Sequence, residues 1–154
     1  MRKTVEANVL IKRPIEDVFQ AVTALDSAPQ WQAELIAVKD VSESPIRAGT
    51  TFTAVLRFLG RRIEDVLLVT AFEPNSKLSL ETISGPLPSE LDFSLEPVRE
   101  GTKVAYSGAW QLPSGVLTLL TPAKPILDRL DQRQWQANLN RLKELVEAGF
   151  EYSV

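Results

Sequence analysis

The stretch from Ile126 to Ala148, ILDRLDQRQWQANLNRLKELVEA, decides the fold of this 154-residue chain. It contains no Gly or Pro and is rich in Leu, Ala, Gln, Glu, Lys and Arg, which lose little side-chain freedom in a helix. Pro125 precedes it and Gly149 follows it, where these two residue types commonly begin and end helices. The sequence therefore predicts one long C-terminal helix.

The apolar side chains of this helix do not form a single stripe. At about 100° per residue they point in two directions more than a quarter-turn apart. The first direction holds Ile126, Leu127, Leu130 and Ala137, and the second holds Trp135, Leu139, Leu142, Leu145 and Val146. The polar residues Asp131, Gln134 and Asn138 lie between them. A helix that covers a solid core keeps one apolar face. We therefore expect residues 127–138 to line a cavity and residues 135–146 to clamp onto the rest of the fold.

The chain before the helix mostly alternates with the period of a strand. Val5–Lys12 predicts a half-buried strand, Pro14 opens a short helix, and Ala28–Leu35 predicts a second short helix. Six further strands are predicted at Ile36–Val41, Thr50–Leu59, Arg61–Phe72, Lys77–Ser84, Glu90–Glu96 and Thr102–Leu112. Their short connections indicate a meandering antiparallel sheet with one buried face. The apolar run within Leu112–Pro125 is expected to cover one end of the cavity.

Composition narrows the function classes. The net charge of −3 gives no electrostatic reason to expect binding of nucleic acid or anionic membranes, and we interpret Lys12-Arg13 and Arg61-Arg62 as solvated faces. No apolar run approaches the ~20 residues of a membrane span, and the N-terminus lacks the pattern of a signal peptide. We expect one soluble cytoplasmic domain over residues 1–154, without membrane insertion.

The chain has no Cys and no His. Their absence excludes disulfides, zinc sites of the Cys/His type and catalysis through a thiolate or an imidazole. No acidic cluster has the spacing of a metal site, and no glycine-rich phosphate loop is present. We expect neither a metal nor a cofactor.

Several segments together resemble the START-like, or SRPBCC, superfamily of polyketide cyclases/dehydrases and Bet v 1-like proteins. They are the first strand running into RPIEDVFQAVTALDSAPQW, the corner VTAFEP-NSKL, the turn EGTKV and the closing LNRLKELVE. The resemblance covers essentially the whole chain. It implies an α+β helix-grip fold in the order β-α-α-β6-α, in which a curved antiparallel sheet of about seven strands wraps the C-terminal helix. It also implies an apolar pocket between the sheet and that helix, but it narrows the function poorly because this fold serves many functions.

The candidate ligand-binding residues are the inward positions of the strands and of the helix. They are Phe52, Leu56, Phe58, Ile63, Asp65, Leu67, Leu80, Phe93, Tyr106, Trp110, Leu127, Leu130, Gln134 and Asn138. Each apolar member could equally be plain core, because a pocket wall and a core look alike in a sequence. Gln134 and Asn138 could instead be solvated at an overhanging helix end.

Asp65 is the most specific candidate. Simple alternation places it on the inward face with Ile63 and Leu67, where its carboxylate could orient a ligand hydroxyl or act as an acid or base. A bulge could instead turn Asp65 to solvent beside Arg62. Tyr106 and Trp110 each add one polar group to an aromatic body and could hold an aromatic ligand, or simply pack against the helix.

These residues support three hypotheses. The first is a non-enzymatic binder or carrier of a small hydrophobic ligand, such as a lipid, an isoprenoid or an aromatic, polyketide-like metabolite. The second is a cyclase/dehydratase-like enzyme, with Asp65 and Tyr106 as weak catalytic candidates and Gln134 as a further polar group. The third is a protein-interaction module. The sequence leaves open whether the protein is a monomer or a homodimer.

Overall fold

The computed structural model describes the backbone of residues 2–111 and 124–149, and the side chains of residues 4–111 and 131–149. The elements are β1 (Arg2–Ile11), α1 (Ile15–Thr23), the 3-10 helix η1 (Leu25–Gln30), β2 (Leu35–Lys39), β3 (Thr51–Phe58), β4 (Arg61–Glu73), β5 (Lys77–Ser84), β6 (Ser89–Val98), β7 (Gly101–Gln111) and α3 (Lys124–Glu147). The cover expected within residues 112–125 lies almost wholly outside the described residues.

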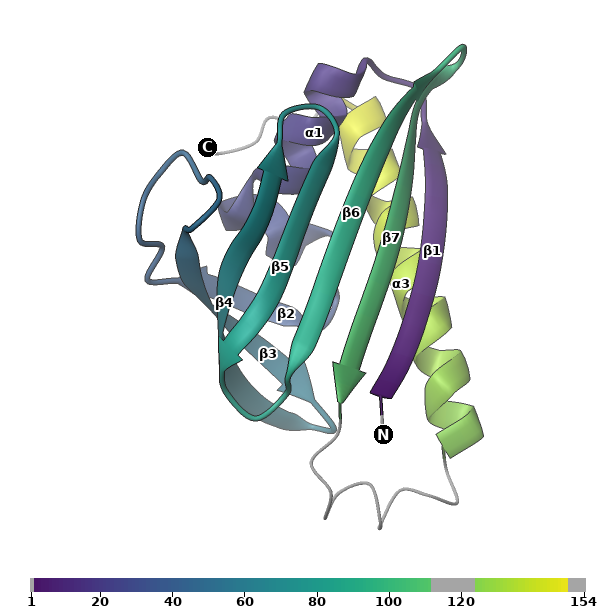
Figure 1. Cartoon of the computed structure of the whole chain (residues 1–154). Coiled ribbons are helices and arrows are strands. Elements are labelled where there is room, and N and C mark those ends of the chain that lie inside the picture. The colour runs from purple at the N-terminus through teal and green to yellow at the C-terminus, as the bar shows by residue number, and fades with distance from the viewer. Residues whose placement is uncertain (1, 112–123, 150–154) are drawn as a thin grey trace.

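The seven strands form one antiparallel sheet in the order β1-β7-β6-β5-β4-β3-β2. The sheet curves so that α3 lies behind β1 and β7 and α1 lies across its upper end (Figure 1). The predicted helix-grip fold and the order of its elements are confirmed. Alternation is clearest in β1, where Val5, Ala7, Val9 and Ile11 are buried and the residues between them are exposed.

The second short helix differs from the prediction of Ala28–Leu35. It begins and ends earlier, as the 3-10 helix η1, and carries Pro29 inside it. Residues after Gln30 turn the chain, since Leu35 already pairs with Leu56 of β3. Pairing with the sheet therefore takes the residues that would have extended the helix.

The C-terminal half of α3 clamps onto the fold as predicted. Trp135, Leu139, Leu142 and Val146 are buried. Ala137, assigned to the other apolar direction, is exposed. Its single methyl group buries little apolar area, so the large side chains set the rotation of the helix. The side chains of Ile126, Leu127 and Leu130 lie outside the described residues.

Polar side chains of α3 bind the free backbone groups at the edge of β1. Gln132 Nε2 donates to the carbonyl oxygen of Glu6, and Gln136 Nε2 donates to that of Asn8 at 2.8 Å. Lys143 Nζ donates to the carbonyl oxygen of Leu10 at 2.8 Å. The backbone N–H of Lys12 donates to Glu147 Oε2 at 2.8 Å. The helix thus covers a strand edge that would otherwise be open to pairing with another chain.

Strand β3 is buried on both faces near its middle. Phe52 and Ala54 point inward, while Thr53 and Val55 are also buried. Lys39 of β2 pairs with Thr53, Glu64 of β4 pairs with Val55, and the two charged groups meet at 2.9 Å. This ion pair crosses the outer face of β3, and the aliphatic stem of Lys39 helps to shield the strand.

Candidate functional site

A cavity of about 70 Å³ lies between the inner face of the sheet and η1. Eleven of the fifteen residues that line it are apolar, and they come from η1 and strands β2 to β6. The apolar set is Leu25, Ala28, Leu35, Val38, Phe52, Ala54, Leu56, Leu67, Leu80, Leu91 and Phe93. The polar set is Gln32, Asp65, Thr82 and Ser89. An apolar wall with a few convergent polar groups is the usual construction of a small-molecule site.

Asp65 places a carboxylate in this apolar wall. Its residue is 1% exposed, so the strand keeps its alternation at this point and no bulge turns the side chain to solvent. Asp65 Oδ1 accepts a hydrogen bond of 3.3 Å from the backbone N–H of Leu87. Burial raises the pKa of Asp65 above its ordinary value, and the Leu87 hydrogen bond offsets part of that rise. No ion pair joins Asp65 to any residue in the described part of the chain.

The loop between β5 and β6 supports this carboxylate. Gly85 has φ +131°, and a Cβ at this position would overlap Asp65 Oδ1, so only glycine fits without a shift. The backbone N–H of Ser89 donates to Thr82 Oγ1 at 3.2 Å, and Ser89 Oγ donates to the carbonyl oxygen of Leu87 at 3.0 Å. These bonds fix the loop that carries the donor to Asp65.

Four aromatic side chains form a cluster beside the cavity, and one of them, Trp135, comes from α3. The Tyr106 and Trp135 rings stack with centroids 3.7 Å apart and planes 12° apart. Phe93 lies against Tyr106, Trp135 and Trp31, with centroids 5.1 to 6.1 Å apart. Phe93 also lines the cavity, so this cluster forms one of its walls. Trp31 is 2% exposed, and its Nε1 has no hydrogen-bond partner among the described residues.

The hydroxyl of Tyr106 lies close to Gly108, the second residue after it on β7. Burial raises the pKa of Tyr106 well above its ordinary value, and the negative charges of Asp131, Glu34 and Asp92 add to the rise. Tyr106 is therefore a neutral phenol at physiological pH. In that state it can donate a hydrogen bond but cannot act as a general base.

A buried amide network joins α3 to the turn before β2. Asn138 is 1% exposed; its Oδ1 accepts hydrogen bonds from the backbone N–H of Ala33 at 3.2 Å and from Gln134 Nε2 at 3.0 Å. Asn138 Nδ2 donates to the Glu34 carboxylate at 3.2 and 3.3 Å. Burial raises the pKa of Glu34; hydrogen bonds from its own backbone and from Asn138 oppose the rise, and the charge of Asp131 adds to it.

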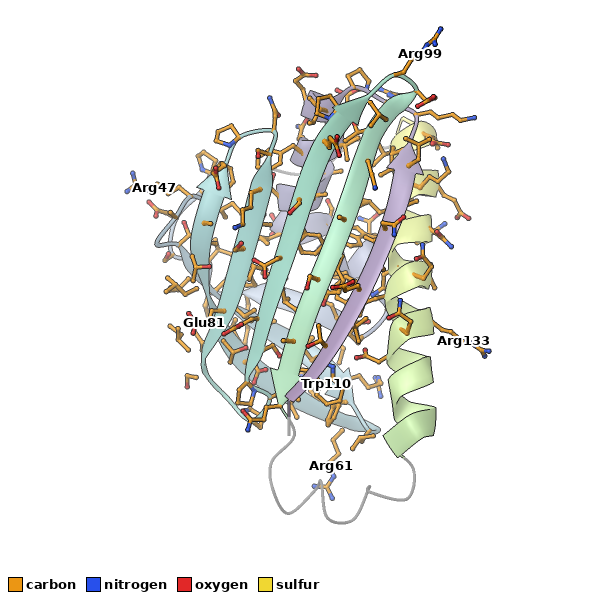
Figure 2. The ribbon with its side chains drawn as sticks, turned by 45° about the vertical axis from the view of Figure 1, so that its right-hand side comes forward. Arg47, Arg61, Glu81, Arg99, Trp110 and Arg133 are labelled. Atoms are coloured by element: carbon orange, nitrogen blue, oxygen red, sulfur yellow. The ribbon has the colours of Figure 1, made fainter. Side chains whose placement is uncertain are left out.

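Trp110 lies at the lower end of β7 (Figure 2). Its Nε1 donates to Asp131 Oδ2 at 2.6 Å, and its ring packs edge-on against Phe58 with centroids 5.8 Å apart. These contacts tie the far end of β3 to β7 and α3.

The structure brings together six of the predicted ligand-binding residues in the cavity wall: Phe52, Leu56, Asp65, Leu67, Leu80 and Phe93. The other described candidates do not line this cavity. Ile63 is half-buried on β4, and Phe58 and Trp110 pack against each other. Tyr106 belongs to the aromatic cluster, and Gln134 and Asn138 belong to the amide network. The side chains of Leu127 and Leu130 lie outside the described residues.

Sequence reasoning missed Gln32 and Glu34, which fell within a segment predicted to be helical. It also missed Thr82 and Ser89, which flank the Gly-Pro-rich β5–β6 loop. That loop follows β5 directly, and β5 neighbours β4 in the meander. The predicted strand order therefore already placed the loop close to Asp65, and this could have indicated Thr82 and Ser89.

Comparison with known proteins identifies the family of this chain. Residues 2–147 match the family model described as polyketide cyclase/dehydrase and lipid transport. The chain belongs to this family. No curated protein matches the chain.

Solved structures share the fold of this family member. A Thermus thermophilus protein is 20% identical with a TM-score of 0.78, covering 96% of this chain and 99% of its own. A START superfamily protein from Mycobacterium smegmatis is 15% identical with a TM-score of 0.71, covering 94% and 97%. The di-domain ARO/CYC StfQ from the steffimycin biosynthetic pathway is 15% identical with a TM-score of 0.76, covering 97% of this chain and 52% of StfQ. Among the described residues of this chain, no helix is long and apolar enough to cross a membrane.

Proposed function

We propose that this protein binds a small, mainly hydrophobic molecule in the cavity between the sheet and η1, with the polar end of the molecule at Asp65. The observation that carries the proposal is a buried carboxylate without an ion-pair partner in the described chain, set in a mainly apolar wall. A buried carboxyl group is costly unless a donor satisfies it. A ligand hydroxyl or phenol would supply a second donor beside the Leu87 N–H.

The size of the cavity limits what enters without movement. About 70 Å³ is less than the roughly 150 Å³ in which an apolar cavity holds benzene. Gln32, Val38 and Leu91 are only half-buried and form part of the rim. We infer that a ligand larger than a few heavy atoms displaces these side chains outward and enlarges the site.

A direct test is native mass spectrometry of the purified protein, followed by titration with fatty acids, isoprenoid alcohols and flavonoid-like phenols. The proposal predicts that ligands with a hydroxyl or phenol bind more tightly than their methyl ethers. It also predicts that Asp65→Asn reduces this preference about tenfold, since one hydrogen bond to a charged group contributes about 1.5 kcal/mol. No saturable binding by any of these classes, or an equal affinity for alcohols and ethers, would count against it.

A cyclase/dehydratase-like activity is the second candidate function, and the raised pKa of Asp65 favours it. A carboxyl group with a raised pKa can exchange protons nearer to neutral pH than an exposed one, as proton transfer during an aldol-type cyclisation requires. If the protein is an enzyme of this kind, Asp65→Asn abolishes turnover of a poly-β-keto substrate while the substrate still binds. A binder without catalysis leaves the substrate unchanged in both forms.

A further inference from the structure

The hairpin that joins β3 to β4 carries an unusual residue at its tip. Phe58 pairs with Arg61, which leaves the two-residue turn Leu59-Gly60, with φ +51° and +76°. Two positive φ angles are typical of a type I′ turn, in which Asn, Asp or Gly is strongly preferred at the first position. Leucine pays the steric cost of a left-handed conformation, and its side chain is 51% exposed.

The other positions with positive φ follow the usual preference. The non-glycine residues with positive φ in the described chain are Asp40, Leu59 and Asn75, and only Leu59 is apolar. Asparagine would make this turn more stable. The exposed side chain of Leu59 adds little stability through burial in the protein core. Leu59 therefore places an exposed apolar side chain at the tip, where it is available for a contact outside the molecule.

Three arginines surround this leucine. Arg57 pairs directly opposite Arg62 on the two strands, and Arg61 follows the turn, so the fold gathers three like charges at one tip. All three side chains are exposed, and none forms an ion pair with a described residue. The nearest acid in sequence, Glu64, is ion-paired with Lys39 at 2.9 Å, and the charge of Arg62 makes a smaller contribution to lowering the pKa of Glu64. Like charges opposite each other on neighbouring strands are destabilising, and an anionic partner would relieve this repulsion.

We propose that this hairpin tip, defined by Arg57, Leu59, Arg61 and Arg62, docks on the surface of anionic lipid bilayers. The arginines complement negatively charged headgroups, and Leu59 enters the boundary of the acyl chains. An exposed leucine at the centre of the charges fits a lipid surface better than nucleic acid, which is bound through phosphate contacts and has no apolar layer. The sequence-based interpretation of Arg61-Arg62 as a solvated face did not include Arg57, which only the strand register brings to the same place.

The position of the tip suits such docking. Figure 2 shows Arg61 below Trp110 at the lower end of the molecule, while Arg99 extends from the β6–β7 turn at the opposite end. Phe58 holds the tip in place by packing on Trp110. Docking through this end would leave the opposite end, with Arg99, in solvent. The proposal concerns surface binding and does not require a membrane-spanning segment.

The test is co-sedimentation of the full chain with vesicles of phosphatidylglycerol or of phosphatidylcholine. We expect binding to phosphatidylglycerol vesicles that weakens as ionic strength rises to about 0.15 M, and little binding to phosphatidylcholine. Arg61→Gln with Arg62→Gln should weaken binding by about 25-fold, at roughly fivefold per arginine near a charged surface. Arg99→Gln is the matched control at the other end and should leave vesicle binding unchanged.

Leu59→Asn separates docking from a structural role. Asparagine should raise Tm by a few degrees because it accepts a positive φ, yet it should weaken vesicle binding about tenfold by removing the apolar contact. Equal binding by the wild type and by both tip variants would overturn the proposal. Binding to RNA or heparin without binding to phosphatidylglycerol vesicles would also overturn it and assign the tip to another polyanion. The substituted residues Leu59, Arg61 and Arg62 lie outside the cavity wall, so their effect on vesicle binding is independent of the proposed function.

Discussion

The backbone of Gly85 lies directly against the carboxylate of Asp65, so closely that a Cβ at position 85 would overlap Asp65 Oδ1. The residue that carries the polar group of the cavity is thus held by a loop from the next hairpin. This contact links the conformation of the β5–β6 loop to the chemistry of the site.

Gly85→Ala should destabilise the fold by more than Gly60→Ala. Both glycines have positive φ, but only Gly85 lies against other atoms, whereas a Cβ at Gly60 would meet nothing within 4 Å. Conformational strain alone predicts a loss of about 1 kcal/mol for Gly60→Ala. The added overlap with Asp65 should bring the loss for Gly85→Ala to about 2–4 kcal/mol. Urea denaturation of the two variants measures the difference, and equal losses would show that the loop moves away freely.

Asp65→Asn should make the protein more stable at pH 7. Burial raises the pKa of Asp65 in the folded state above its value in the unfolded state. The free energy of unfolding is therefore highest below the unfolded pKa, where the carboxyl is protonated in both states. It falls as pH rises through the folded pKa, because the buried carboxyl must then ionise. Asparagine does not ionise, so we expect the variant to have a free energy of unfolding about 1 kcal/mol higher than the wild type at pH 7. The gain should disappear by about pH 3, which lies below the ordinary aspartate pKa of about 3.9, so the wild-type carboxyl is protonated in both states. Thermal unfolding across pH tests this, and a variant that is less stable at pH 7 contradicts it.

Asn138→Ala should cost about 2–4 kcal/mol. The substitution leaves the backbone N–H of Ala33 and the Glu34 carboxylate without their buried partner. It also removes a hydrogen bond that lowers the pKa of Glu34, so that pKa should rise further. Glu34→Gln in the Asn138→Ala background should recover part of the loss at neutral pH. A double-mutant cycle of the two positions measures the coupling, which would be near zero if the hydrogen bonds do not form.

Leu142→Ala and Gln134→Leu should act differently on stability and on binding. Leu142 is fully buried on the clamping face of α3, and its truncation should cost about 2–5 kcal/mol. Gln134 is half-buried and holds Asn138 Oδ1, so its replacement should cost only about 1 kcal/mol while altering the polar groups near the interior. Gln134 lies outside the cavity wall, so we expect Gln134→Leu to change ligand binding only through Asn138 and the amide network. Unchanged affinities for alcohols, acids and phenols would show that this network does not influence the cavity.

Gln132→Ala combined with Gln136→Ala should expose the edge of β1. Each glutamine satisfies a carbonyl oxygen on that edge, so the pair should lose about 2 kcal/mol of stability and gain a tendency to self-associate. Arg133→Ala is the matched control, because Arg133 is exposed and points away from the sheet (Figure 2). Analytical ultracentrifugation at rising concentration reports the association, and a monomeric double variant would show that other groups protect the edge.

The sheet and the long helix were predictable because their residues repeat with clear periods. Val5 to Ile11 alternates without exception, and Trp135, Leu139 and Val146 share one helical face. The burial of Asp65 followed from the same alternation, although the sequence alone could not exclude a bulge. The second short helix was predicted too far along the chain, because the end of η1 is set by the pairing of Leu35 with Leu56. These two residues are 21 positions apart, so a local sequence pattern does not reveal their contact. The charge cluster at Leu59 was missed for the same reason, since the strand register places Arg57 opposite Arg62.

The pairing of β1 with β7 has a consequence for biosynthesis. Ile11 pairs with Thr102 and Arg2 with Gln111, so β1 leaves the ribosome about a hundred residues before its neighbour β7. At translation rates of about 5–20 residues per second the wait is about 5 to 20 s. Throughout that time neither β7 nor the glutamines of α3 can shield the β1 segment. The β1 segment therefore stays unpaired until β7 and α3 have both been synthesised.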